Sequence, residues 1–337
     1  MQEELRWFVP EYYLDFRCKC GSCRSSCCTG WDIALGRDEY YRLIGMDCSP
    51  ELHRRLQCAF HPAQSPSPDH FQVISPNWLG DCHMHDENGL CMLHAECGEE
   101  MLPEVCRMYP RSLKKSGDMN IAVCTNSCEG VIEMLLALKH PLRFSTQKLA
   151  AHPHDDRAGF NPDCVEMMQE PDLPLPQRIL RIIGKDETSA TQEEAIDMLL
   201  SALEKIADSA NSISDFIGEA LQRYAGEDRA ETYAQDAERF ERNFPDWQPA
   251  FENILANHLV YMNYPCADDR LNESDAAWGL CATYGVMRLF AAACLKDKNA
   301  QEDFVDVIAS VFRAVEHSSF YYNMHILVAD PAAMLLL

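Results

Sequence analysis

Basic residues are scarce in this chain of 337 residues. It has 29 Lys and Arg against 53 Asp and Glu, which gives a formal net charge of −24. A nucleic-acid binder needs a basic surface for the phosphates, so this charge balance argues against that class. It also argues against an anionic membrane surface as a partner. We therefore expect neither nucleic acid nor membrane among the partners.

Long apolar runs are also missing. The first six residues, Met-Gln-Glu-Glu-Leu-Arg, lack the apolar segment of a secretory signal. We find no stretch of about 18 apolar residues, the length that a membrane-spanning helix needs. These absences predict a cytoplasmic protein.

Cysteine, in contrast, is abundant and unevenly placed. Of 17 cysteines, 13 lie at or before Cys128. Without a secretory signal we expect a reducing compartment, where clustered thiols are typical of metal ligands rather than of disulfides. The first group is Cys18, Cys20, Cys23, Cys27 and Cys28, and the second is Cys82, Cys91, Cys97, Cys106, Cys124 and Cys128.

The spacing favours an iron–sulfur cluster, with zinc as the alternative. Zinc sites usually show two Cys-x2-Cys pairs, whereas here only Cys20 and Cys23 have that spacing. The order Cys20, Cys23, Cys27 reverses the Cys-x3-Cys-x2-Cys signature of radical S-adenosylmethionine enzymes. No Gly-x-Gly-x-x-Gly loop follows a strand pattern. Buried, reduced cysteines without metal are a third interpretation, and the histidines His83, His85 and His94 are more typical of neighbours than of ligands.

The chain divides into three stretches by composition. Residues 1–140 carry the cysteine groups, the proline-rich residues 141–177 resemble a connector, and residues 178–337 show apolar stripes at helical spacing. Thr191 and Glu194 form a capping box at the start of one stripe. We predict a mainly α fold, in which an irregular cysteine-rich, metal-binding N-terminal part packs on a C-terminal helical bundle.

The cysteine pattern resembles the flagellin lysine N-methylase family. The stretch from Phe16 to Ile33 fits Phe-x-Cys-x4-Cys-x3-Cys-Cys-x-Gly-Trp-x-Ile, and Cys106–Arg111 fits Cys-Arg-x-Tyr-Pro-Arg. Ser127–Gly130 stands for a Ser-Cys-Pro-Glu element but lacks the proline. The resemblance covers residues 9–136 and beyond them only 257–261.

This resemblance implies a methyltransferase that uses S-adenosylmethionine to methylate flagellin lysines and contains an iron–sulfur cluster, expected to be 4Fe-4S. A wider relation exists to cysteine-cluster proteins described only as zinc- or iron-chelating. The metal ligands implied by the matched positions are Cys18, Cys23, Cys27, Cys28, Cys82, Cys91, Cys106 and Cys128.

Four further residues are candidates for the chemistry. Arg107 and Arg111 suit the carboxylate of the cofactor, although surface salt bridges are the commoner role of arginine. Trp31 would line the cofactor pocket or serve as a core aromatic, and Asp32 is a candidate base. Two other functions stay open, namely a non-catalytic zinc- or iron-chelating or redox protein, and an interaction module that needs metal only for folding.

Overall fold

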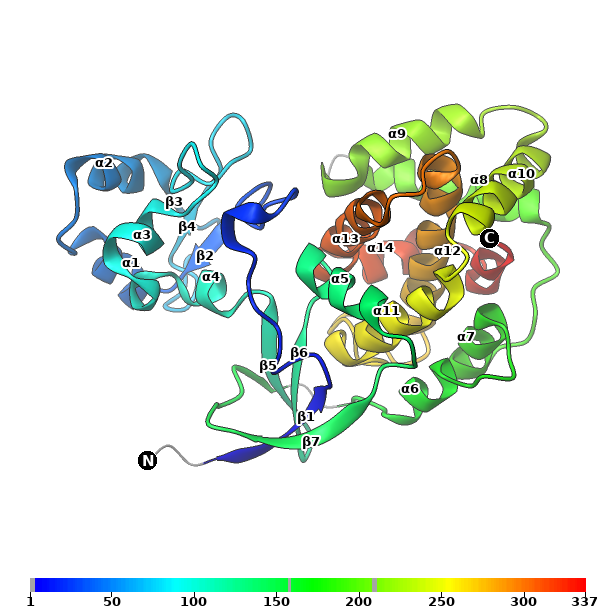
Figure 1. Cartoon of the computed structure of the whole chain (residues 1–337), viewed down its shortest axis with the longest axis horizontal. Helices are drawn as coiled ribbons and strands as arrows, with labels where there is room; N and C mark the ends of the chain where they lie inside the picture. Colours follow the sequence, from blue (N-terminus) through cyan, green and yellow to red (C-terminus); the bar gives the residue numbers. More distant parts are fainter. Residues whose placement is uncertain (1–3, 157–158, 208–210) are drawn as a thin grey trace. The chain divides into compact units, whose positions relative to one another are not determined.

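The computed structural model describes residues 4–156, 159–207 and 211–337. The chain forms two compact units (Figure 1). Residues 17–109 make the first, which we call the cysteine-rich unit. Residues 1–16 and 110–337 make the second, which we call the helical unit. These bounds differ from the stretches 1–140, 141–177 and 178–337 expected from composition.

A five-stranded sheet explains why the N-terminus groups with the helical unit. The strand order is β7 (Phe144–Leu149), β1 (Leu5–Pro10), β6 (Met119–Cys124), β5 (Arg111–Ser116) and β8 (Asp155–Asp156). β1 pairs parallel with β6 and antiparallel with β7, so segments more than 100 residues apart share one sheet. The supposed connector thus contributes β7 and β8.

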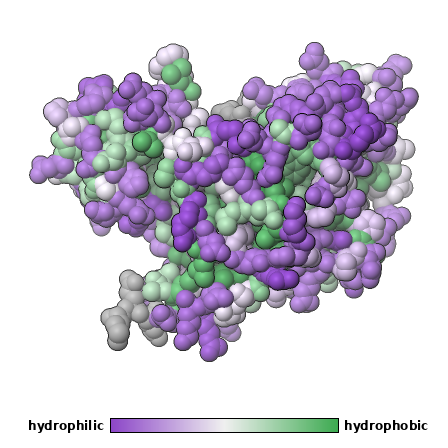
Figure 2. Space-filling view, in the orientation of Figure 1, coloured by the Kyte–Doolittle hydropathy of each residue, from purple (hydrophilic) through white to green (hydrophobic). Residues whose placement is uncertain are grey.

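Helices form the rest of this unit. Their apolar stripes face inward, as the sequence predicts, and the capping box of α8 is present because Glu194 N–H donates to Thr191 Oγ1 at 3.2 Å. The helices are α5 (Glu129–Ala137), α6 (Asp163–Met168), α7 (Leu175–Ile183), α8 (Gln192–Ile206), α9 (Ser214–Arg223), α10 (Arg229–Asn243), α11 (Trp247–Tyr261), α12 (Ala276–Leu295), α13 (Gln301–His317) and α14 (Phe320–Leu327), with short 3-10 turns at Asn211–Ile213 and Pro331–Leu336. The surface over α9 and α10 is mostly hydrophilic (Figure 2).

Helix α12 is the core of the helical unit and contacts α8, α9, α10, α13 and α14. It is long and apolar enough to cross a membrane, but 94% of the apolar stretch is buried inside the protein. The expectation that no such stretch exists was wrong, because Gly, Thr, Tyr and Arg interrupt the apolar residues in the sequence. A Cβ at Gly279 would lie 2.1 Å from the Tyr321 ring, so this glycine lets α14 pack closely.

The cysteine-rich unit has its own small core. It contains the sheet β2 (Ile33–Leu35), β4 (Gln72–Ile74), β3 (Phe60–Pro62) and the helices α1 (Arg37–Ile44), α2 (Pro50–Ala59), α3 (Met92–Cys97) and α4 (Glu104–Met108), with 3-10 turns at Cys20–Ser22 and Glu99–Met101. Leucines such as Leu43, Leu52 and Leu56 are buried together, and Cys82, Cys91 and Cys97 pack against them. The mainly helical prediction therefore holds for the C-terminal part, whereas the N-terminal part is less irregular than expected.

Candidate functional site

Backbone pairing brings the two cysteine groups of the cysteine-rich unit together. Cys82 N–H donates to Cys28 O at 2.7 Å, and Gly30 N–H donates to Gly80 O at 2.8 Å. Gly30 and Gly80 have φ values of 91° and 88°, a conformation that favours glycine. An isolated antiparallel β-bridge pairs His85 with Cys91. The loops around Cys28, Cys82 and Cys91 consequently converge.

The thiols of this convergence interact electrostatically. Desolvation, together with the nearby Cys28 and Cys91, raises the pKa of Cys82 to about 11. Desolvation and the neighbouring Cys82, Cys28 and Cys91 likewise raise the pKa of Cys106, although that residue reaches the surface. Four thiols from distant positions therefore lie within range of one another, which is the donor chemistry that an iron–sulfur cluster or zinc requires.

One of these thiols, Cys28, loses its proton more readily than an ordinary cysteine does. A hydrogen bond from Cys27 lowers the pKa of Cys28 to about 6, and Ser26 and His85 act in the same direction. In the described residues, no group of three or more His, Cys, Asp or Glu side chains has the geometry to hold a metal ion. The thiols are gathered, but the ligand sphere is not assembled.

Of the other predicted ligands, Cys18, Cys23 and Cys27 precede Cys28 in the cysteine-rich unit, and Cys128 lies in the other unit. Cys18 is exposed and accepts a hydrogen bond from Cys20 N–H at 3.3 Å, while Cys23 is half-buried. Cys128 belongs to the helical unit, where it precedes α5. The ligand roles of all eight cysteines stay predictions.

The predicted cofactor-binding and catalytic residues do not form one group. Trp31 Nε1–H donates to Cys27 O at 2.8 Å, and its ring meets Tyr109 edge-on at 5.7 Å. Asp32 and Arg107 are exposed in the same unit. Arg111 lies in the helical unit, where its Nη2 donates to Phe16 O at 3.1 Å. Their proposed roles stay predictions.

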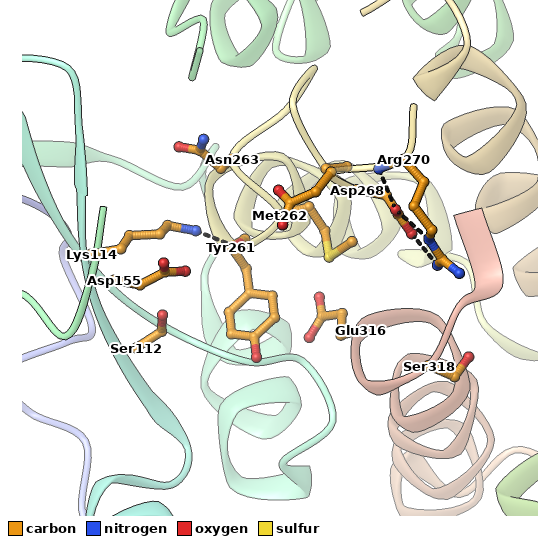
Figure 3. A pocket seen from close by; sticks show the side chains of 12 residues that line it. Ser112, Lys114, Asp155, Tyr261, Met262, Asn263, Asp268, Arg270, Glu316 and Ser318 are labelled. Carbon is orange, nitrogen blue, oxygen red and sulfur yellow. Dashed lines mark hydrogen bonds and ion pairs between the residues drawn. The ribbon is translucent and has the colours of Figure 1, made fainter. Parts of the chain in front are cut away.

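The helical unit contains a pocket of about 480 Å³ (Figure 3). Small-molecule sites typically measure about 300–1,000 Å³, so the pocket is large enough for a cofactor. Strand β5, strand β8, the end of α11, the loop after it and the end of α13 supply the walls. The lining residues are Ser112, Lys114, Asp155, Tyr261, Met262, Asn263, Ala267, Asp268, Asp269, Arg270, Glu316 and Ser318.

Charged residues of both signs lie in this pocket. Lys114 is 4% exposed and its ammonium donates to Tyr261 O, at the C-terminal end of α11, where helix carbonyls attract cations. Arg270 forms a two-point ion pair with Asp268, with Nε–Oδ1 at 2.9 Å and Nη2–Oδ2 at 2.6 Å. Figure 3 shows Lys114 and the Arg270–Asp268 pair on opposite sides of Met262.

A buried carboxylate–imidazole pair supports the pocket wall. Glu316 Oε1 accepts a hydrogen bond from His258 Nδ1 at 2.8 Å, and both side chains are 0% exposed. His258 Nε2 is 2.9 Å from the Tyr321 hydroxyl. Burial raises the pKa of Tyr321 well above its usual value, so the phenol stays protonated and can donate to the imidazole.

The other Glu316 oxygen binds the segment just before Cys128. Glu316 Oε2 accepts hydrogen bonds from Asn126 N–H at 2.9 Å and from Thr125 Oγ1 at 2.5 Å. The Ser127 hydroxyl is 2.8 Å from His317 Nε2. Residues from the N-terminal motif region thus join α11 and α13 in one polar network. The sequence singled out 257–261 but not Lys114 or Glu316, because neither of these belongs to a local motif.

Comparisons with known proteins find a family model that matches part of the helical unit. Residues 181–329 match the model of the FliB lysine N-methylase C-terminal domain. The resemblance predicted from the sequence is confirmed, but the expectation that it would be faint beyond residue 136 was wrong.

Curated relatives carry the same name. The chain is 28% identical over 112 residues to lysine-N-methylases of Salmonella choleraesuis and Salmonella typhimurium, a match that takes in 33% of this chain and 27% of each relative. It is 23% identical over 110 residues to the flagellar biosynthetic protein FliU of Salmonella muenchen, covering 33% of this chain and 64% of FliU. No solved structure matches the chain.

Most of the pocket lies in the family-matched region. Tyr261, the loop 262–270, Glu316 and Ser318 all fall within 181–329. Strands β5 and β8 supply the remaining wall from outside it. The FliB-type domain therefore forms the pocket together with the five-stranded sheet.

Proposed function

We propose that this chain is a protein lysine N-methyltransferase that transfers a methyl group from S-adenosylmethionine to lysine side chains of flagellin. The main support is that the segment matching the FliB lysine N-methylase C-terminal domain supplies most of a cofactor-sized pocket. The flagellar name of the FliU relative supports flagellin as the protein substrate.

The chemistry is a displacement at a methyl carbon. The lysine nitrogen forms the new N–C bond as the C–S bond breaks, and the sulfonium becomes the neutral thioether of S-adenosylhomocysteine. The amine must first lose a proton, because free lysine has a pKa near 10.4. Carboxylates that line the pocket, including Asp155 and Asp269, provide an environment that attracts the lysine cation.

The proposal includes an iron–sulfur cluster in the cysteine-rich unit, with zinc as the alternative. Cys28, Cys82, Cys91 and Cys106 would hold it, because their thiols already influence one another. When bound, the metal would add a further connection between loops that already pair through backbone hydrogen bonds and the Thr29–Asp81 side-chain bond.

The direct test is methyl transfer by the full chain. Anaerobically purified protein is incubated with flagellin and S-adenosylmethionine, and methylated lysines are located by peptide mass spectrometry. We expect lysine methylation that depends on both reagents, with unmethylated flagellin after omission of the donor. Iron with comparable acid-labile sulfide in the same preparation is the expected metal content. Absence of methyl transfer by metal-replete protein would rule out the proposed activity.

A non-catalytic metal-chelating or redox protein is the second candidate. It is favoured by the gathered thiols and by the lowered pKa of Cys28, which require no substrate pocket. Such a protein would bind metal through its thiols but would show no saturable binding of S-adenosylmethionine. Calorimetric titration with that cofactor therefore separates the two candidates.

A further inference from the structure

We propose that His85 is a ligand of the metal centre in the cysteine-rich unit and binds the metal through Nε2. The centre is then held by one imidazole as well as by thiolates. This inference rests on the proposed function, which places a metal among Cys28, Cys82, Cys91 and Cys106, and it adds a donor of a different kind. The sequence pattern instead favours His85 as a neighbour of the metal.

The Nε2 atom of His85 is buried and has no hydrogen-bond partner in the part of the chain that the structure describes. Buried polar atoms nearly always have a partner, so an orphaned one calls for an explanation such as a bound water or ion. Imidazole nitrogen is a common ligand of both zinc and iron. His85 therefore has a ligand atom that no hydrogen bond of the described residues occupies.

The backbone holds His85 between two of the predicted cysteine ligands. His85 N–H donates to Cys82 O at 2.9 Å, which closes a turn with two residues between Cys82 and His85. On its other side, His85 pairs with Cys91 in the antiparallel bridge. Residues directly opposite each other in such a pair point to the same face, with Cβ atoms about 4.5–5.5 Å apart. Backbone pairing thus makes His85 a neighbour of both cysteines.

The third neighbour is Cys28. Its side chain interacts electrostatically with His85, and its thiol also influences Cys82 and Cys91. One imidazole and three thiols therefore lie within range of one another. The loops must shift to bring these donors onto one metal, because no metal-holding group is assembled among the described residues.

Both candidate metals accept such a donor set. Structural zinc sites include the Cys3His type, and the separation of Cys82 and His85 by two residues equals that of a Cys-x2-Cys pair. In iron–sulfur proteins, histidine replaces cysteine at one iron of Rieske centres, where it raises the reduction potential. A centre with four ligand positions then takes three of the four thiols.

The test identifies the ligands by X-ray absorption at the edge of the bound metal. Full-length, anaerobically purified wild type, His85→Ala, His85→Cys and His83→Ala are compared, and metal and acid-labile sulfide are measured in each. For zinc, a nitrogen ligand lies at about 2.0–2.1 Å and a thiolate sulfur at about 2.3 Å, and an imidazole adds scattering from its outer ring atoms. His83 is the matched control, because it lies in the same turn and interacts with His61 and Arg55.

We expect an imidazole among the sulfur ligands in the wild type and in His83→Ala. His85→Ala should lose this signal and bind the metal at least about tenfold more weakly in competition with a chelator, since loss of even an outer partner of a ligand costs that much. His85→Cys should keep the metal and show sulfur ligands only.

A wild type that binds its metal through sulfur alone overturns the inference, and this outcome requires no variant to fold. An imidazole signal that persists in His85→Ala also overturns it, because another histidine is then the ligand. Methyl transfer by a metal-replete wild type without an imidazole ligand refutes only this inference. A wild type that neither binds metal nor transfers methyl groups refutes the proposed function as well.

Discussion

The helical unit and the cysteine-rich unit are stabilised in different ways. In the helical unit, α12 contacts six other α-helices, and whole aromatic side chains such as Phe290 and Phe312 are buried. In the cysteine-rich unit the regular elements are short, and the core holds leucines, Ile74 and Met84 with half-buried cysteines at its edge. The comparison teaches that apolar burial suffices for the first unit, whereas the second would gain a further contribution from the proposed metal at its thiols.

Metal removal should produce the largest difference in stability between the two units. We expect a chelator, or Cys28→Ser combined with Cys82→Ser, to unfold or loosen the cysteine-rich unit while the helical unit keeps its melting temperature. Binding free energies on the order of 10 kcal/mol are typical of structural thiolate sites, so the effect should be the largest of all. Limited proteolysis with mass spectrometry would show cleavage confined to residues 17–109.

The control for this experiment is Cys281→Ser, because Cys281 is a buried thiol of α12 outside the cysteine groups. It should leave the metal content unchanged. Equal proteolysis of both units after chelation would contradict the distinction between them.

Loss of the buried Glu316–His258 pair should have the next largest effect, which is a lower stability of the helical unit. Glu316→Ala leaves His258, Asn126 N–H and Thr125 without their acceptor in a site with 0% exposure. Breaking a buried pair from one side typically costs about 3–5 kcal/mol. Calorimetry should show a lower melting temperature for the helical unit only, and Glu302→Ala, exposed at the start of α13, is the matched control. A wild-type melting temperature in Glu316→Ala would show that the network adds no stability.

Sequence periodicity predicts the helices well and the site poorly. The helical spacing of apolar residues indicates where α8, α11 and α13 lie, because each apolar stripe is contained in one stretch of chain. The sheet was missed because β1 pairs with β6 more than 100 residues later, and no local pattern encodes that pairing.

The pocket was missed for the same reason. It takes Lys114 from β5, Tyr261 from α11 and Glu316 from α13, and of these only Tyr261 lies in a short segment, 257–261, that the sequence singles out. One signal was present, since His258, together with Asn253 and Asn257, interrupts the apolar stripe of α11, and buried polar residues inside such stripes often mark a site. The cysteine groups could be recognised because metal ligands often lie close together in the sequence. Which cysteines would share a metal depends on the geometry of the loops, and the sequence does not encode that locally.

A change of pH should have a smaller effect on stability, and we expect it in the helical unit. Desolvation around its ring lowers the pKa of His317, although the residue reaches the surface; Glu316 opposes this shift and Arg313 adds to it. The folded helical unit then binds fewer protons than the unfolded chain, so its stability rises with pH up to about 6.5 and is lost as the pH falls below that value. Melting curves of the helical unit between pH 5 and 8 should flatten in His317→Gln and keep their slope in the exposed control His152→Gln. An identical slope in His317→Gln would mean that other groups cause it.

The smallest expected effect lies at the start of α8. Thr191→Ala removes the hydroxyl that accepts from Glu194 N–H at 3.2 Å, and loss of such a cap costs about 1 kcal/mol. Ser201→Ala is the control, since it changes an exposed position inside the same helix, where alanine is the better helix former. Because α8 belongs to the helical unit, we expect the melting temperature of that unit to fall by a few degrees while metal content and proteolysis of the cysteine-rich unit stay constant. A loss of metal in Thr191→Ala would instead reveal that the two units fold as one cooperative body.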